Sequence, residues 1–314
     1  MVNIGIIGVG GVGGYFGGKL CRSLSANPDM NFYFMARGPH LEAIRQHGLR
    51  VSTSAEGEWV CRPTLATDHF TDLPPLDVCL LCVKSYDLPH TLAQLKPVVV
   101  PTTLILPLLN GIDIYERIRA VISTGLVFPA CVYVGTHIES YGKVAQKGGA
   151  CKILLGKDPQ TPNFKPQMLL DLLAQSQIKY EWFDDAYPQI WEKYVFIVAF
   201  GLVTAAFDKT LGQVMASKEL SDKVIAVMSE IAKLARCQGV ILPETIVTDS
   251  HQKGGDFPYE TKTSFQRDVE QPNKPDERDL FGATIIRLGL ALGVKTPVTQ
   301  ELSEKLNLRK GLSL

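Results

Sequence analysis

Short apolar runs alternate with amphipathic segments through the first half of the chain. The apolar runs are rich in β-branched and aromatic residues, as strands are: Val2–Ile7, Phe32–Ala36, Asp77–Val83 and Thr103–Leu108. Segments with helical spacing follow the first three of them: Tyr15–Leu24, His40–His47 and Leu88–Leu95. Because strands that alternate with helices pair in parallel through right-handed crossovers, we expect an α/β fold with a Rossmann-type, doubly wound, mostly parallel sheet.

Other strand-like segments do not fit this alternation. Val51–Ser54 and Val60–Ala66 predict a hairpin that leaves the main sheet. Gly125–Val134, His137–Ala145 and Cys151–Gly156 follow one another without helical patterns, and we expect them at an antiparallel edge of the sheet.

The second half of the chain has no strand-like alternation. Tyr187–Phe207 carries few charges in its later turns and predicts one long buried helix. Ser217–Gln238 predicts an amphipathic helix and Arg278–Leu292 another. We therefore expect an α/β domain over residues 1–184 and an all-helical C-terminal domain over residues 185–314.

The composition argues against some classes of partner. Of the 314 residues, 46% are hydrophobic and 20% charged, and Lys plus Arg equals Asp plus Glu at 32 each. Such a chain has no net field to attract nucleic acid or an anionic membrane. Asp77, Lys84 and Asp87 interrupt the most apolar early region, so we expect no membrane-spanning run. Because the first residues show no basic region before an apolar stretch and no cleavage site, we expect no signal peptide.

Seven cysteines are scattered along the chain, which favours a reducing, cytoplasmic setting. Cys79 and Cys82 form a C-x-x-C in an apolar run. Residues three apart on a strand point to opposite faces and cannot chelate one ion. We therefore expect buried thiols there and no metal site.

A glycine-rich turn stands between the first predicted strand and the first predicted helix. It matches G-x-G-x-x-G as Gly8-Val9-Gly10-Gly11-Val12-Gly13. In a dinucleotide site the first glycine allows the tight turn, the second lets backbone approach a pyrophosphate, and the third permits close helix–strand packing. The alternative is a simple glycine-rich turn, but the strand–turn–helix context predicts dinucleotide binding by these six residues.

The end of the second predicted strand bears on the choice of dinucleotide. Phe34–Gly38 contains no carboxylate, and none follows until Glu42, whereas NAD sites usually place an acidic residue there. Arg37, 24 residues beyond Gly13, can bind a 2′-phosphate. The alternative is a solvated surface arginine; the pattern favours NADP.

Two polar residues follow the next two predicted strands. Lys84 comes after Leu80–Val83 and Asn110 after Leu106–Leu109, at the edge where open parallel sheets bind ligands. An ammonium there can contact the nicotinamide ribose or a substrate carboxylate, and an amide can both donate and accept hydrogen bonds. Each residue alone is compatible with an ordinary loop, but together they predict the edge of an active site.

Lys193 lies at the start of the apolar part of the helix predicted over residues 187–207. Burial would desolvate its ammonium and suit it to proton donation. The alternative is a lysine that extends from the first helical turns into solvent. These residues alone leave both readings open.

Several motifs occur together in one order: the glycine turn, Arg37 in A-R-G-P-H-L, V-K-S-Y-D at 83–87, L-N-G at 109–111 and W-E-K at 191–193. This set resembles the ketopantoate reductases (2-dehydropantoate 2-reductases) over nearly the whole chain. The resemblance implies NADPH-dependent reduction of ketopantoate to pantoate, a step in pantothenate and coenzyme A synthesis. It also implies that the first domain binds NADP and that the helical domain binds substrate and carries catalytic residues.

The resemblance implies roles for individual residues. Lys193 matches the general acid and also contacts substrate, and Ser264 matches the serine that binds the substrate carboxylate. Lys84 and Asn110 match the lysine and asparagine at the nicotinamide, where Asn110 is also catalytic.

The family's glutamate partner of the lysine lies eight residues beyond an aspartate that matches Asp268. This spacing reaches Asp276, which we predict as a catalytic residue. Glu277 is adjacent, and either carboxylate can fill the role.

The chain departs from the family at three positions. Ile197, Gly201 and Leu211 stand where the family has asparagines that bind substrate oxygens. Three lost amides remove hydrogen bonds of about 0.5–1.5 kcal/mol each and make the pocket less polar. Besides ketopantoate reduction, the alternatives are reduction of a less polar 2-keto acid and a non-catalytic NADP-binding sensor. We expect a small-molecule 2-keto acid as partner, with a homodimer possible.

Overall fold

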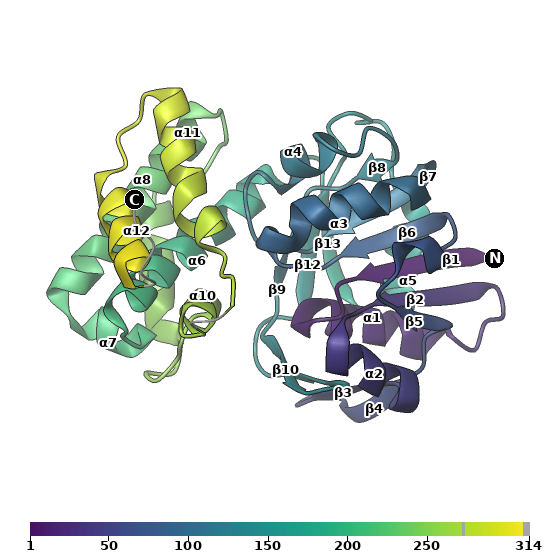
Figure 1. Cartoon of the computed structure of the whole chain (residues 1–314). Coiled ribbons are helices and arrows are strands. Elements are labelled where there is room, and N and C mark those ends of the chain that lie inside the picture. The colour runs from purple at the N-terminus through teal and green to yellow at the C-terminus, as the bar shows by residue number, and fades with distance from the viewer. Residues whose placement is uncertain (272–273, 310–314) are drawn as a thin grey trace. The chain divides into compact units, whose positions relative to one another are not determined.

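The computed structural model describes residues 1–271 and 274–309, and the chain divides into two compact units after Ala186 (Figure 1). The boundary expected after residue 184 lies two residues before this division. Among the described residues, all strands belong to the first unit, and the second is helical.

The large sheet of the first unit has six strands in the order β5-β2-β1-β6-β7-β8, and each neighbouring pair is parallel. Its strands are β1 Val2–Ile7, β2 Met30–Met35, β5 Leu65–Thr67, β6 Leu76–Leu81, β7 Val99–Pro107 and β8 Leu126–Val127. The predicted Rossmann-type sheet is therefore confirmed. Because the strands are parallel, the carboxyl ends of β2, β1, β6 and β7 meet at one edge.

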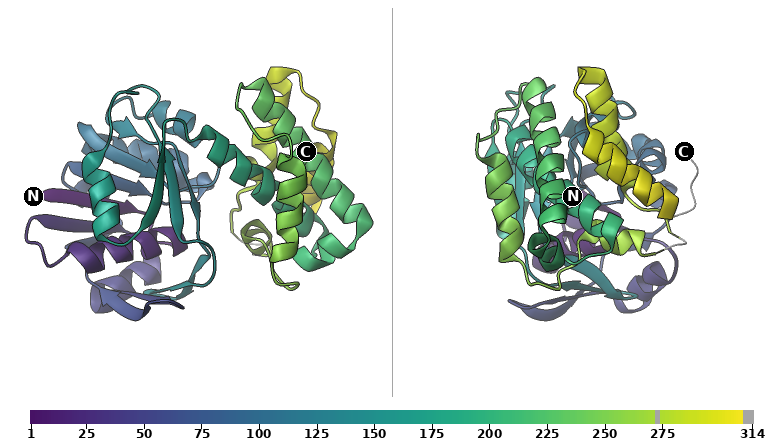
Figure 2. Two further views of the ribbon diagram at one scale, coloured as in Figure 1. Left: turned by 180° about the vertical axis from the view of Figure 1, so that it is seen from behind. Right: turned by 90° about the vertical axis from the view of Figure 1, so that its left-hand side faces the viewer.

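The helices of the first unit include three that the sequence predicts and two that it does not. The predicted ones are α1 Gly11–Leu24, α2 Gly38–His47 and α3 Leu88–Leu95, and the others are α4 Ile114–Arg119 and α5 Gln167–Gln175. Helix α3 lies in front of the large sheet in Figure 1, whereas α5 is in front in the left view of Figure 2, seen from behind. Helices thus cover both faces, as doubly wound folds require.

The remaining strands form two further sheets rather than the expected antiparallel edge of the large sheet. A four-stranded sheet has the order β10-β11-β3-β4, and a three-stranded sheet has the order β13-β12-β9. Their strands are β3 Leu49–Thr53, β4 Gly57–Cys61, β9 Ala130–Tyr133, β10 Thr136–Ser140, β11 Lys143–Gln146, β12 Lys152–Gly156 and β13 Lys179–Phe183. The predicted hairpin is present as the antiparallel pair β3–β4.

Two segments that were each predicted as one strand are divided. Pro129, which has no N–H to donate, lies between β8 and β9 within residues 125–134. Gly142, at φ 76°, lies in the turn between β10 and β11 within residues 137–145. These two breaks allow the chain to leave the large sheet and build the smaller ones.

Glycines on α1 allow it to contact the four-stranded sheet closely. A Cβ on Gly14 would lie 2.7 Å from the side chain of Val144 on β11, and one on Gly18 would lie 2.7 Å from Val51 on β3. The glycine-rich sequence of this helix therefore serves packing beyond the dinucleotide motif.

The second unit is built around α6, which contacts α7, α8, α9, α10 and α12. Its helices are α6 Tyr187–Phe207, α7 Leu211–Ala216, α8 Lys218–Cys237, α9 Ile246–Gln252, α10 Ser264–Val269, α11 Thr284–Leu292 and α12 Pro297–Arg309. The predicted burial of α6 is confirmed, since Val195, Val198 and Ala199 are fully buried. The helix predicted over residues 278–292 is present, but its first part is a π-helical turn at Asp279–Ala283.

Helix α6 is long and apolar enough to cross a membrane by length and composition, with a mean hydropathy of 1.6 in its most apolar window. The expectation that no apolar run reaches membrane-spanning length is therefore wrong for α6. Because 72% of that window is buried inside the structure, α6 has the character of a core helix.

Candidate active site

The glycine turn has the backbone geometry that the sequence predicts. Gly8 has φ 96°, a conformation that residues with a Cβ rarely adopt. A Cβ on Gly13 would lie 2.1 Å from the carbonyl oxygen of Gly8, so only glycine fits there. A Cβ on Gly10, in contrast, would have no atom within 4 Å. The turn is therefore tightly packed at Gly8 and Gly13 and open at Gly10.

The N–H groups of this turn fall into two sets. Those of Gly8 and Val9 donate to the carbonyl of Met35, at 3.1 and 3.0 Å, and hold the turn against the end of β2. Those of Gly11–Gly13 belong to the first turn of α1, where no acceptor is available within the helix. Together with the helix dipole, the second set can bind an anion such as a pyrophosphate.

Arg37 lies two residues beyond β2, at the same edge of the sheet, and its side chain is 73% exposed. Its guanidinium already has a partner within this unit. Nη2 of Arg37 lies 2.6 Å from Oδ2 of Asp87, and Nη1 lies 3.5 Å from Oδ1. Asp87 ends the 3₁₀ turn Ser85–Asp87 that follows β6. The residues at the end of β2 do not indicate this carboxylate, because Asp87 lies 50 residues beyond Arg37 in the sequence.

Lys84 and Asn110 occupy corresponding positions after adjacent strands. Each lies three residues beyond its strand, Lys84 after β6 and Asn110 after β7. Both side chains are half-buried. Gly111, at φ 133°, lets the chain turn directly after Asn110. The first unit thus brings the glycine turn, Arg37, Lys84 and Asn110 to one edge of one sheet.

Lys193 lies in α6 and is 9% exposed, so the alternative of a lysine extended into solvent is wrong. Trp191 and Tyr194, on either side of it in sequence, are each 1% exposed. The hydroxyl of Tyr194 donates to the carbonyl of Leu280, which ties α6 to the π-helical turn. The lysine is therefore held in a helix that is fixed on several sides.

The two candidate carboxylates have different surroundings. Oδ1 and Oδ2 of Asp276 each accept a hydrogen bond from the guanidinium of Arg278, from Nε and Nη2 at 2.9 Å, and Oδ1 also accepts from the Arg278 N–H at 3.1 Å. Nη1 of Arg278 then donates to Asn307 on α12 at 2.7 Å. Glu277 is 3% exposed, and its carbonyl accepts from the N–H groups of Leu280 and Phe281.

Ser264 is the first residue of α10, and its side chain is exposed. The neighbouring Thr263 is the N-cap, and its hydroxyl accepts from the N–H of Gln266 at 3.2 Å. The same hydroxyl lies 2.9 Å from that of Thr204 on α6. The start of α10, and with it Ser264, is thereby fixed to the helix that carries Lys193.

The position of Gly201 is filled by aromatic rings. A Cβ there would lie 2.7 Å from the ring of Phe281. Phe281 stacks on Phe265 with ring centroids 4.4 Å apart and planes 9° apart. Of the other two positions where the family has asparagine, Leu211 is buried and Ile197 is half-buried. No amide can occupy position 201 without displacing the rings, so this part of the unit is apolar.

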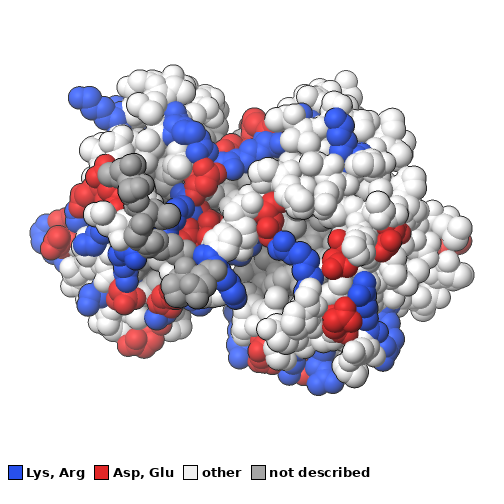
Figure 3. All heavy atoms as spheres, in the orientation of Figure 1, with Lys and Arg blue, Asp and Glu red and all other residues white. Residues whose placement is uncertain are grey.

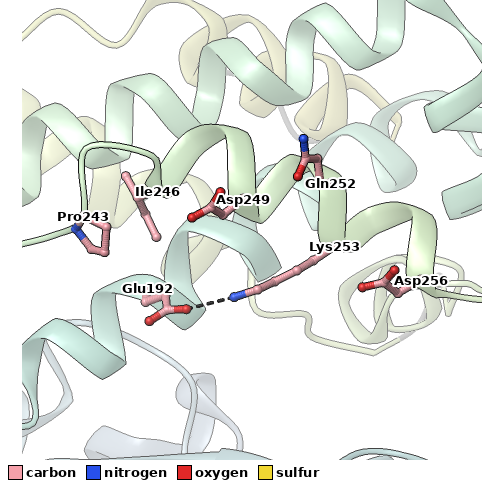
Figure 4. A pocket seen from close by; sticks show the side chains of 7 residues that line it. All are labelled: Glu192, Pro243, Ile246, Asp249, Gln252, Lys253 and Asp256. Carbon is pink, nitrogen blue, oxygen red and sulfur yellow. Dashed lines mark hydrogen bonds and ion pairs between the residues drawn. The ribbon is translucent and has the colours of Figure 1, made fainter.

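A surface pocket of about 420 Å³ opens beside α6 in the second unit (Figure 4). Glu192 and Lys253 face each other in it and form an ion pair at 2.8 Å. The other lining residues are Pro243, Ile246, Asp249, Gln252 and Asp256. Its lining includes none of the predicted substrate residues.

The side chains of both units show no dominant charge on the face drawn in Figure 3, where acidic and basic residues are interspersed. Within residues 1–271 and 274–309, no cluster of three or more His, Cys, Asp or Glu side chains is placed to hold a metal ion. Cys79 is fully buried, and burial raises the pKa of its thiol to about 12.

Two family models match the chain. The model described as Ketopantoate reductase PanE/ApbA matches residues 4–160, and its C-terminal counterpart matches residues 185–310. Uncharacterized oxidoreductase YkpB of Bacillus subtilis is 25% identical over 305 residues, which cover 96% of this chain and 97% of that protein. A 2-dehydropantoate 2-reductase of Mesorhizobium japonicum is 25% identical over 316 residues, covering 94% of each.

Solved structures agree with these matches. A PanE/ApbA family ketopantoate reductase from Ralstonia eutropha superposes with a TM-score of 0.87 at 25% identity, over 99% of each chain. A D-mandelate dehydrogenase with NADH and anilino(oxo)acetate shares the fold, with a TM-score of 0.84 at 20% identity over 99% of each chain. The glycine turn, the two-unit organisation and these matches agree, and the chain belongs to the ketopantoate reductase family of oxidoreductases.

Proposed function

We propose that this chain is an NADPH-dependent reductase of the 2-dehydropantoate 2-reductase type, which converts ketopantoate to pantoate for pantothenate and coenzyme A synthesis. The observation that carries the proposal is the burial of Lys193 in α6. Dinucleotide binding alone needs no buried ammonium in the helical unit, whereas reduction of a keto group needs a proton donor. The activity in the printed name of the Mesorhizobium japonicum relative supports the same reaction.

The residues of the first unit fit a nicotinamide dinucleotide. The open backbone at Gly10 and the N–H groups of Gly11–Gly13 suit the pyrophosphate. Arg37 suits a 2′-phosphate and so favours NADPH, and Lys84 and Asn110 suit the nicotinamide end. When bound, the cofactor supplies the hydride, and this unit orients its nicotinamide ring toward the keto carbon.

The chain's own residues supply the remaining chemistry. Lys193 donates a proton to the keto oxygen and stabilises the negative charge that develops there. The amide of Asn110 donates a hydrogen bond to the same carbonyl, and the Ser264 hydroxyl donates to the substrate carboxylate. Asp276 or Glu277 orients the ammonium.

One observation favours a second substrate class. Phe281 and Phe265 fill the space beside Gly201, so no amide side chain at this position binds a polar substrate oxygen. A less polar 2-keto acid, branched or aromatic, suits such a surface better. The D-mandelate dehydrogenase with the same fold was solved with anilino(oxo)acetate, which carries an aromatic ring next to its oxoacetate group.

A steady-state screen with purified protein tests these alternatives. NADPH oxidation is followed with ketopantoate and with aliphatic, branched and aromatic 2-keto acids. The main proposal expects the highest kcat/KM with ketopantoate, and the second expects it with an apolar acid. Binding of NADPH without turnover of any acid would contradict both and favour a sensor protein.

We further propose that the enzyme acts in the cytoplasm and can assemble as a homodimer. Size-exclusion chromatography with light scattering measures the molecular mass of the assembly in solution. A mass near the 34.5 kDa of one chain at all concentrations would contradict the dimer.

A further inference from the structure

The Arg37–Asp87 pair joins the two loops on either side of the glycine turn. Arg37 follows β2, Asp87 follows β6, and β1, which leads into the turn, lies between these strands in the sheet. The pair therefore extends across the carboxyl end of β1, where the dinucleotide turn begins.

This pair contributes little to the stability of the fold. The Arg37 side chain is 73% exposed, and exposed ion pairs are worth little because water and salt screen them. Both partners are nevertheless engaged in a fork-to-fork contact, with two nitrogens on two oxygens. A weak but specific contact at a ligand-binding edge is better explained by binding than by folding.

The fork of Arg37 is the group that a 2′-phosphate needs. Arginine binds phosphate and carboxylate through the same pair of N–H donors, so Asp87 and a 2′-phosphate compete for them. If the phosphate displaces Asp87, two negative groups lie next to one guanidinium and repel each other. A ribose 2′-hydroxyl has no such conflict, because a carboxylate at this edge can accept its hydrogen bond.

We propose that Asp87 determines cofactor selectivity in two ways. Its carboxylate competes with the 2′-phosphate of NADPH for Arg37, and it accepts a hydrogen bond from the 2′-hydroxyl of NADH. The enzyme then uses both nicotinamide cofactors, and Asp87 lowers the preference for NADPH that Arg37 alone would create. This inference rests on the proposed function, since it requires that the glycine turn binds a nicotinamide dinucleotide.

Direct binding of NADPH and NADH to the full chain, by calorimetry without substrate, tests the inference. Asp87→Asn keeps the shape of the side chain and removes its charge. We expect it to lower the Kd of NADPH about tenfold and to leave that of NADH equal or higher, because only NADPH carries the competing phosphate. Asp87→Glu, which keeps the charge, should stay near the wild-type ratio.

Two controls separate this effect from general changes in charge. Glu181→Gln removes the same charge from β13, where Glu181 pairs with Lys152, and should not move the ratio of the two Kd values. In an Arg37→Met background, Asp87→Asn should lose most of its effect on NADPH, because the shared partner is gone.

The outcomes that contradict the proposals are distinct. An unchanged ratio in Asp87→Asn, or an equal shift for both dinucleotides, overturns the role of Asp87 while leaving dinucleotide binding intact. Wild-type protein that binds neither dinucleotide overturns the proposed function itself.

Discussion

At the scale of single residues, the proposed chemistry depends most on Lys193. Keto reduction creates negative charge on oxygen, and a buried ammonium both stabilises that charge and supplies the proton. We expect Lys193→Ala to lower kcat by about 10²–10⁴-fold. The Kd of NADPH should change little, because the glycine turn and Arg37 belong to the other unit.

Lys253→Ala is the matched control for this variant, since Lys253 is an exposed lysine that pairs with the neighbouring Glu192. It should keep wild-type kcat. Full turnover in Lys193→Ala would remove the general acid from the mechanism, and parallel loss of stability and activity would indicate a structural role for the side chain.

The two adjacent carboxylates should differ in the kind of effect that their loss has. Asp276 is held by the guanidinium of Arg278, so Asp276→Asn should lower the free energy of unfolding by about 1–3 kcal/mol. Glu277→Gln removes the charge of the carboxylate that we expect to orient Lys193, and should instead lower kcat by about 10²-fold.

Urea unfolding and steady-state kinetics on both variants measure these effects. A larger fall of kcat in Asp276→Asn than in Glu277→Gln would support the catalytic role that the family spacing predicts for Asp276. Circular dichroism at the assay temperature ensures that each variant is folded.

At the scale of elements, different glycines of the turn serve cofactor binding and fold stability. Gly10→Ala places a methyl group in open space, so stability should stay within about 1 kcal/mol while NADPH binding weakens at least tenfold. Gly13→Ala forces a Cβ against the Gly8 carbonyl. It should lower the free energy of unfolding by about 1–3 kcal/mol or more, which is the usual cost of a strained backbone conformation. Thermal unfolding and calorimetric titration measure the two effects, and equal destabilisation of both variants would contradict this division.

In the second unit, one buried carboxylate caps a helix. Glu230 of α8 accepts from the N–H groups of Val298 and Thr299 at the start of α12, at 2.8 and 3.1 Å, and from the Thr299 hydroxyl at 2.6 Å. Glu230→Ala should lower the free energy of unfolding by about 2–3 kcal/mol, because buried donors lose their acceptor. In urea unfolding, the exposed Glu304→Ala serves as the control, and equal values for the two variants would contradict the cap.

At the scale of the whole molecule, His40 makes stability depend on pH. It is buried on α2, and Nδ1 accepts from the N–H of Gly142 in the β10–β11 turn at 3.0 Å. Burial lowers the pKa of this imidazole below its ordinary 6.5. The unfolded chain therefore takes up a proton that the folded chain does not, and stability is lost as pH falls below about 6.5.

We expect His40→Gln, which retains an acceptor, to lose less of its unfolding free energy than wild type between pH 7 and pH 5. The exposed His69→Gln should behave as wild type does. Urea unfolding at several pH values measures this difference. An identical pH dependence in wild type and His40→Gln would contradict a buried neutral imidazole.

The long elements could be predicted from the sequence because their signals are local and repeated. Leu88–Leu95 and Tyr187–Phe207 are helices with the bounds that their patterns predict. The short helices α7 and α10 could not be predicted. Each has only six residues, too few to show the helical spacing of apolar residues. The two small sheets could not be predicted either, because their strands join segments distant in the sequence, as in the pairing of β11 with β3.

By itself, the sequence determined the α/β architecture, the glycine turn and the family. The architecture follows from the local alternation of strand and helix patterns, and the family from short motifs in one order. The glycine turn follows from local demands of the backbone, namely the positive φ of Gly8 and the absence of room for a Cβ at Gly13. Only the tertiary structure decided two contacts at the proposed site. Arg37 forms an ion pair with Asp87, and the ring of Phe281 occupies the space beside Gly201. These contacts join residues far apart in the chain, and the distance between them is set by how the strands and helices pack, which no local pattern records.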